Sequence, residues 1–223
     1  MAKHKLFRFS ENETFSNLIQ LPYTEVMKGI PLKGKWSTDF FKNNQPIILE
    51  LGCGKGEYTL GLAKKYPHIN FLGVDVKGAR LWRGCKTSCD DGMKNVGFIR
   101  TQIELIDHYF APKEISEIWI TFPDPQPKGY KSRKRLTSPL FLNRYRNILS
   151  KDGIIHLKTD NTSLFDYTLE IIEEFGHKLW YQERDIYESN CKDDPVEIQT
   201  FYEKKYLELG QAIHYLKFSF NEK

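Results

Sequence analysis

The sequence predicts an α/β fold in which a mostly parallel sheet of seven strands carries helices on both faces and ends with an antiparallel strand. Strand and helix patterns alternate almost without exception after residue 45, which is typical of such sheets. The first strand is a continuous apolar run bounded by Pro and Gly, as expected for a parallel strand buried on both faces. With 223 residues, the chain is long enough for one such domain with a full hydrophobic core.

The individual elements follow from apolar spacing and from the residues that interrupt it. We predict strands at residues 46–52, 70–76, 96–101, 117–122, 154–160, 178–185 and 212–220. We predict helices within residues 57–67, 78–92, 104–110, 138–153, 164–176 and 200–210. The helix in 138–153 has Pro in its first turn and Gly just past its end, an order that helix termini favour.

The first 45 residues lack this regularity. They are polar and interrupted by Pro and Gly, so we predict an N-terminal arm and capping region at residues 1–45 and the α/β domain at residues 46–223. The N-terminus has no signal-peptide core, and no stretch approaches the roughly 20 apolar residues that a membrane-spanning helix needs. We therefore expect a cytoplasmic protein with no membrane partner and with reduced cysteines.

Two of the four cysteines are close enough in sequence to be considered as metal ligands. Cys85 and Cys89 lie four residues apart on a predicted helix and therefore share a face. No Cys or His pair follows at the spacing of a zinc site, so we expect buried helical thiols and no metal.

Positive charge is concentrated in one loop. The formal net charge is only +4, yet residues 128–135 include five basic residues and no acidic ones. This loop follows a Pro-rich segment in which Asp124 is the one carboxylate. A local basic cluster on a nearly balanced protein indicates contact with a polyanion, although a solvated surface loop is the general alternative.

Four of the predicted strands end in, or just before, an acidic residue. These residues are Glu50, Asp75, Asp124 and Asp160. Each alone has an ordinary explanation, because Asp and Glu often cap the next helix or face water at a strand exit. Together they indicate a ligand site, since open α/β sheets bind ligands beyond the C-terminal ends of their strands.

A glycine loop, LELGCGKGEY, lies beside this rim. Gly52, Gly54 and Gly56 allow a sharp turn and a close approach of the backbone to a ligand. Glu57 occupies the third glycine position of a dinucleotide fingerprint, which disfavours a pyrophosphate. Asp75 is well placed to accept hydrogen bonds from two ribose hydroxyls. The pattern therefore favours an adenosine ligand without a pyrophosphate, and S-adenosylmethionine is the leading candidate.

These residues resemble known proteins. The loop LELGCGKG with Asp75 resembles the nucleotide site of class I methyltransferases, which have a Rossmann-like fold. The segments FPDPQPKGYKSRKRL, HLKTDN and TFYEKKY, together with GKW at residues 34–36, are similar to the bacterial tRNA (guanine-N7)-methyltransferase family. The similarity spans roughly Gly34 to Phe220. It implies transfer of a methyl group from S-adenosylmethionine to N7 of a guanine in the variable loop of tRNA.

The resemblance also implies roles for individual residues, with Asp124 as the catalytic aspartate. The cofactor-binding positions are Glu50, Gly52, Gly54, Gly56, Asp75, Gln102 and Asp124. The substrate-binding positions are Lys128, Asp160, Thr200, Phe201, Tyr202 and Glu203, and the RNA-contacting positions are Tyr130, Lys131, Ser132, Arg133, Lys134 and Arg135. The family usually has Trp in place of Gln126 and Asp or Asn in place of Gln102, although Gln can still hydrogen-bond an adenine edge.

Methylation at guanine N7 needs no general base, because N7 carries a lone pair and no proton. Asp124 can then accept hydrogen bonds from the guanine N1–H and exocyclic amine, or stabilise the positive charge that builds on the purine. Asp160 can share either role, and the sequence does not divide the roles between them.

Three competing interpretations stay open. The first is a methyltransferase that acts on another RNA, on a small molecule or on a protein. The second is an RNA-binding module with a vestigial cofactor pocket, and the third is an NAD-dependent oxidoreductase. The basic loop disfavours a small-molecule or protein substrate, and the glycine spacing disfavours NAD. A monomer and a homodimer both stay open. The role of the N-terminal arm stays open as well. Its basic residues Lys3, Lys5 and Arg8 either contact phosphates or belong to a disordered tail.

Overall fold

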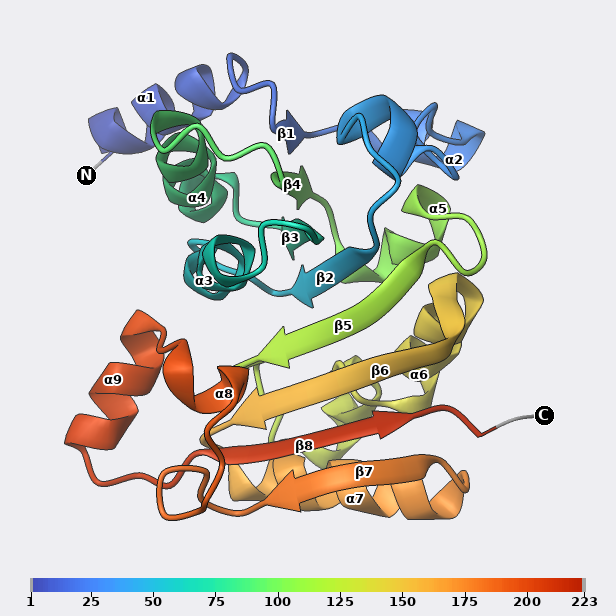
Figure 1. Cartoon of the computed structure of the whole chain (residues 1–223), viewed down its shortest axis with the longest axis vertical. Coiled ribbons are helices and arrows are strands. Elements are labelled where there is room, and N and C mark those ends of the chain that lie inside the picture. Colours follow the sequence, from blue (N-terminus) through green and yellow to red (C-terminus); the bar gives the residue numbers. More distant parts are fainter. Residues whose placement is uncertain (1, 222–223) are drawn as a thin grey trace.

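The computed structural model describes residues 2–221, and its centre is an eight-stranded mixed sheet (Figure 1). In space the strands follow the order β1-β4-β3-β2-β5-β6-β8-β7. Their bounds are Leu18–Ile19 for β1, Ile47–Leu51 for β2, Asn70–Asp75 for β3, Val96–Arg100 for β4, Ile115–Thr121 for β5, Leu149–Thr159 for β6, Lys178–Glu183 for β7 and His214–Ser219 for β8. The terminal strand β8 lies between β6 and β7 and runs antiparallel to both, while the other pairs are parallel.

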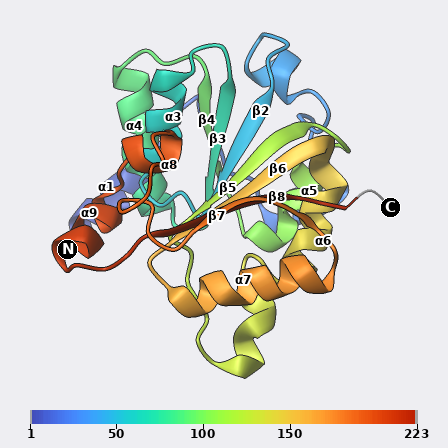
Figure 2. The same ribbon diagram turned by 60° about the horizontal axis from the view of Figure 1, so that its bottom comes forward.

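Helices cover both faces of this sheet (Figure 2). Their bounds are Ala2–Asn12 for α1, Tyr23–Lys28 for α2, Trp36–Phe40 for the π-helix η1, Glu57–Lys65 for α3, Gly78–Asp90 for α4, Ile103–Leu105 for the 3₁₀ helix η2, Ile106–Tyr109 for α5, Gly129–Lys134 for the 3₁₀ helix η3, Pro139–Ile148 for α6, Thr162–Glu174 for α7, Asp194–Glu197 for α8 and Phe201–Glu208 for α9. One core packs α3 and α4 on the sheet through residues such as Tyr58 and Phe98. The other packs α5, α6 and α7 on the opposite face through residues such as Tyr109 and Phe165.

The predicted fold class is confirmed, including the antiparallel terminal strand. The sheet has one strand more than predicted, because Leu18 and Ile19 pair in parallel with Phe98 and Ile99 at the edge. A two-residue strand has no periodicity from which it can be recognised.

The first 45 residues are more regular than the sequence predicted. Helix α1 packs on α4, where Asn12 Nδ2 donates a hydrogen bond of 3.0 Å to the carbonyl of Gly78. Trp36 is completely buried, and its Nε1 donates to the carbonyl of Tyr109 at 2.9 Å. These partners lie 66 and 73 residues away in sequence, so local patterns cannot reveal them. The division at residue 45 stays a prediction.

Two further local predictions are wrong. Helix α6 ends at Ile148, and β6 already begins at Leu149. Gly153 therefore lies inside a strand, where a Cβ would come within 2.5 Å of a methyl group of Leu149. Cys85 is buried as expected, but Cys89, in the last turn of α4, is exposed. None of the helices within residues 2–221 is both long and apolar enough to cross a membrane.

Candidate active site

The C-terminal ends of three neighbouring parallel strands form the candidate site. Strand β2 pairs with β3 on one side and with β5 on the other, so the residues that follow these strands meet at one edge of the sheet. Glu50, Asp75 and Thr121 come from these three strand ends. The topology of the sheet thus brings Glu50 and Asp75 of the predicted rim to one edge, where the loop that carries Asp124 also begins.

The glycine loop between β2 and α3 is shaped by left-handed backbone. Gly52 and Gly54 have φ of 79° and 59°, and a Cβ added at either would meet no protein atom within 4 Å. Their open side faces the rim, so a side chain would take space that a ligand can use. Gly56 differs, because a Cβ there would lie 2.6 Å from the ring of Phe98. We conclude that Gly56 serves packing, whereas Gly52 and Gly54 leave room for a ligand.

Asp75 stabilises this loop and keeps lone pairs free. Its Oδ2 accepts a hydrogen bond of 2.9 Å from the Gly54 N–H, and its Oδ1 accepts one of 2.7 Å from the Lys77 N–H. A carboxylate offers about four acceptor sites, so each oxygen can accept one more bond. Asp75 is buried to 8% exposure and lines a cavity of about 500 Å³.

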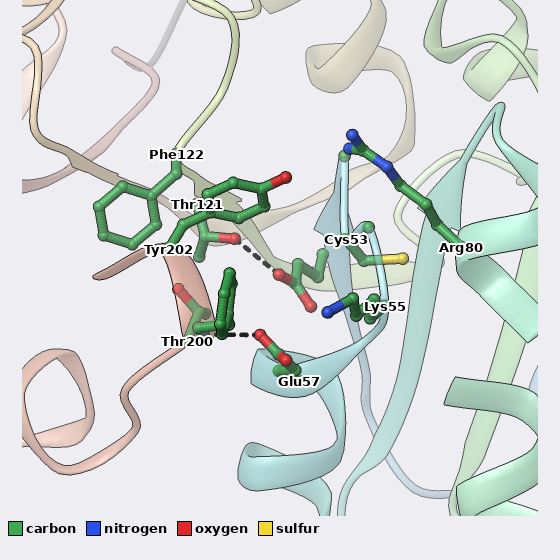
Figure 3. Close-up of a pocket in the computed structure, with 12 residues that line it drawn as sticks. Cys53, Lys55, Glu57, Arg80, Thr121, Phe122, Thr200 and Tyr202 are labelled. Carbon is green, nitrogen blue, oxygen red and sulfur yellow. Dashed lines mark hydrogen bonds between the residues drawn. The ribbon is translucent and has the colours of Figure 1, made fainter. Parts of the chain in front are cut away.

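Two adjoining hollows make up the site. The larger, of about 500 Å³, brings together Asp75, Gln102 and Asp124, with Lys134 among its other lining residues. The smaller, of about 100 Å³, lies over the glycine loop and is lined by Glu50, Gly52, Gly54, Thr200, Phe201 and Tyr202 among others (Figure 3). Gly52, Arg80 and Phe122 line both, so the two hollows adjoin.

Glu50 lies at the floor of the smaller hollow and is buried to 3% exposure. Its Oε2 accepts a hydrogen bond of 2.8 Å from the Thr59 N–H and another from the Thr59 hydroxyl, and its Oε1 accepts one of 2.6 Å from the Thr121 hydroxyl. Burial raises the pKa of Glu50 from 4.5 to about 7, although these hydrogen bonds lower it. The charge of this carboxyl therefore responds to a cation placed beside it.

Asp124 stands on a strained loop that leaves β5. Phe122 and Gln126, on either side of it, have φ of 48° and 46°, a region that non-glycine residues rarely adopt. The Gln126 N–H donates to Asp124 Oδ1 at 3.1 Å. Arg135 stabilises the loop, because its Nε donates a hydrogen bond of 3.1 Å to the carbonyl of Pro125. Asp124 is exposed at the mouth of the larger hollow, where incoming ligands can reach it.

The N-terminus of α9 closes the smaller hollow. Thr200 and Glu203 form a capping box, and the Phe201 N–H donates to Glu57 Oε2 at 2.8 Å. The side chain of Glu203 points away from the hollow and lies completely buried, with its Oε1 2.6 Å from Nζ of the equally buried Lys158. Glu203 therefore anchors α9, while Phe201 and Tyr202 face the site.

The remaining predicted residues stand outside the two hollows. Lys128, Tyr130, Lys131, Ser132 and Arg133 belong to the loop around η3, and Tyr130 is 78% exposed. Asp160 follows β6 and is half-buried, and this burial raises its pKa. Within residues 5–221, whose side chains the structure describes, no three His, Cys, Asp or Glu side chains gather as a metal ion would require.

Comparison with known proteins places this chain in a family. A family model described as "Putative methyltransferase" matches residues 44–216. A tRNA (guanine-N(7)-)-methyltransferase of Christiangramia forsetii is 55% identical over 97% of this chain and 98% of its own length. Another, of Bacteroides fragilis, is 50% identical over 98% of this chain and 86% of its own length. The chain belongs to the tRNA (guanine-N(7)-)-methyltransferase family.

A solved structure supports the fold of this family member. A 16S rRNA (adenine(1408)-N(1))-methyltransferase from Catenulisporales acidiphilia, solved with its cosubstrate SAM, is similar with a TM-score of 0.56. The two chains are 10% identical, and the match covers 87% of this chain and 94% of that one. At this identity the comparison shows the shared methyltransferase fold alone.

The structure of this family member shows three site residues that the sequence analysis did not predict. Thr121 donates to Glu50, Arg80 lines both hollows, and Lys158 anchors α9 through Glu203. Thr121 and Lys158 lie within or beside the quoted motifs, which was the available signal. Arg80 lies in an ordinary amphipathic helix and carries no such signal.

Proposed function

We propose that the protein transfers a methyl group from S-adenosylmethionine to N7 of a guanine in the variable loop of tRNA, in the cytoplasm. The observation that carries this proposal is the larger hollow. It places Asp75 and Gln102, which suit an adenosine, in the same cavity as Asp124, which suits a guanine. A donor and an acceptor base can therefore meet there.

The residues present fit S-adenosylmethionine. Asp75 has a free acceptor position on each oxygen for the ribose hydroxyls, and Gln102 lies at the adenine end of the same hollow. Gly52 and Gly54 leave their inner side open, and Glu50 provides a titratable carboxyl beside them for the cationic amino acid end. When bound, S-adenosylmethionine supplies an electrophilic methyl group on its sulfonium.

The chain's main chemical task is orientation. Guanine N7 is already a nucleophile, so the protein has to hold the base in line with the methyl–sulfur bond, and orientation of this kind can supply about 7–11 kcal/mol. Asp124 accepts hydrogen bonds from the guanine N1–H and amino group, a pattern that adenine lacks. Its negative charge also stabilises the cation that forms on the purine ring.

The basic loop positions the RNA. Lys134 lines the larger hollow, and Lys131 and Arg133 lie on the same short helix η3. Phosphate contacts of this kind set the register of a nucleic acid, whereas contacts to a base edge specify it. Guanine N7 is inaccessible in the deep groove of an A-form helix, so the substrate is a loop nucleotide or one turned out of its stack.

One experiment tests the proposal. Purified protein is incubated with methyl-labelled S-adenosylmethionine and unmodified tRNA, which is then digested to nucleosides. We expect the label in 7-methylguanosine at the variable loop, and no label when that guanine is replaced by adenine. Label in another nucleoside, or persistence of labelling after the replacement, would overturn the proposal.

A further inference from the structure

A second basic surface continues from the candidate site onto α4. Four exposed cations, Arg8, Lys55, Arg80 and Arg83, line a hollow of about 390 Å³ together with Ala79 and Trp82. We call these four cations the α4 basic surface. They come from three separate segments, namely α1, the glycine loop and α4.

The fold builds this surface through the packing of α1 on α4. Arg80 and Arg83 are three residues apart on α4 and therefore share a face. The guanidinium of Arg8 lies 4.8 Å from the centre of the Trp82 ring, and its Nη1 is 3.5 Å from the carbonyl of Ala79. Trp82 is itself held by Glu11, to which its Nε1 donates at 2.6 Å. Arg8 is thus part of an ordered helix and not of a disordered tail, while the side chain of Lys3 lies outside the described residues.

The charges of the α4 basic surface are not neutralised by the protein. Within the described part of the chain, none of its four cations forms an ion pair. Lys86, farther along α4, is by contrast paired with Glu11 at 3.1 Å. Exposed cations left unpaired at the end of α4 nearest the site suit a polyanion.

Arg80 connects this surface to the site. It lines the α4 hollow and also both hollows of the candidate site. The larger site hollow has Lys134 of the η3 loop among its other lining residues. Positive charge therefore runs from the η3 loop, past Asp124, to Arg80 and on to Arg83.

We infer that the α4 basic surface binds phosphates of the same RNA whose base enters the site. This inference rests on the proposed function and extends it. A single group of phosphate contacts leaves the RNA free to pivot about that group, whereas contacts on two sides of the site fix its orientation. The α4 basic surface supplies the second group.

The test is the double charge reversal Arg8→Glu with Arg83→Glu in the full chain. We expect unchanged S-adenosylmethionine binding by calorimetry and a KM for tRNA raised by about tenfold or more. The slope of log affinity against log salt concentration should become less steep by about 1.5 to 2, which corresponds to two lost phosphate contacts. The matched control is Lys28→Glu with Lys94→Glu, the same charge change at exposed positions elsewhere. The control should keep the wild-type salt slope.

The outcomes separate the two proposals. If the wild type forms 7-methylguanosine but the Arg8→Glu, Arg83→Glu variant matches the control in KM and salt slope, the inference is overturned and the proposed function stands. If the wild type does not methylate tRNA, both fall together. Should Arg8→Glu loosen α1, Arg83→Ala alone, which removes no described contact, should still raise KM and flatten the slope by about 1. A slope unchanged in Arg83→Ala would equally overturn the inference.

Discussion

Replacing Lys158 by Met should destabilise the protein strongly. Lys158 Nζ lies 2.6 Å from Glu203 Oε1, and neither side chain has any exposed surface. Burial lowers the pKa of Lys158, while Glu203 acts to raise it. Removing one partner of a buried pair costs about 3–5 kcal/mol, because the other charge stays buried without it. Met retains most of the aliphatic volume, so little of the loss comes from a cavity.

The contacts that remain set the expected loss near the lower end of this range. After the substitution, Glu203 still accepts hydrogen bonds from the Tyr187 hydroxyl at 2.8 Å and from the Thr200 N–H at 3.2 Å. We therefore expect about 3 kcal/mol. With a urea m-value of about 2–3 kcal/mol/M, the unfolding midpoint should fall by about 1 M.

The assay is urea unfolding at equilibrium, with an exposed ion pair as control. Lys64 and Asp91 lie 2.8 Å apart but keep 59% and 41% of their side-chain surface exposed, so Lys64→Met should cost at most about 1 kcal/mol. The double variant Lys158→Met, Glu203→Leu should regain part of the loss, because no charge is then buried, while the Tyr187 hydroxyl and the Thr200 N–H lose their acceptor. A Lys158→Met loss no larger than that of Lys64→Met would refute the anchoring role assigned to this pair.

Three other predictions concern the rim and the glycine loop. Because folded Glu50 keeps its proton up to about pH 7 while an ordinary glutamate releases it near 4.5, the folded state binds more protons between these values. Stability should therefore be highest below about pH 4.5 with respect to this group and fall by up to about 3 kcal/mol as the pH rises to 7. Urea melts across this range should show that decline in the wild type but not in Glu50→Gln, and equal slopes would contradict it. Gly56→Ala should cost about 2–4 kcal/mol of stability, since φ is 73° and the new Cβ would meet Phe98. Gly52→Ala should cost only about 1–2 kcal/mol but weaken S-adenosylmethionine binding in calorimetry, and equal binding by Gly52→Ala and the wild type would argue against the ligand space assigned to Gly52.

The sequence predicted those features that depend on local pattern and chain order. The positions of Glu50 and Asp75 at one edge follow from parallel strands alone, because such strands end on the same side of the sheet. The pairing of Lys158 with Glu203 could not be predicted, since each residue looks like an ordinary exposed charge in its own segment. The buried Trp36 likewise depends on partners more than 70 residues away.

Backbone strain was equally invisible in the sequence. Phe122 adopts a positive φ only because β5, the proline-rich loop and the Arg135 hydrogen bond hold it there. Phenylalanine as a residue type does not signal such a conformation. The sequence could place Asp124 after β5, but the strain that presents it at the mouth of the cavity needed the structure.

The most direct test of the account is the rate of methyl transfer in a single turnover by Asp124→Ala. The exposed carboxylate accepts one described hydrogen bond, from the Gln126 N–H, so its removal should leave the fold intact, and a saturating donor concentration offsets any weaker binding of S-adenosylmethionine. With saturating tRNA and labelled donor, we predict a rate at least about 100-fold below wild type, and a wild-type rate in the exposed control Asp152→Ala. Formation of 7-methylguanosine by Asp124→Ala at the wild-type rate would contradict the central claim that this side chain holds the reacting guanine.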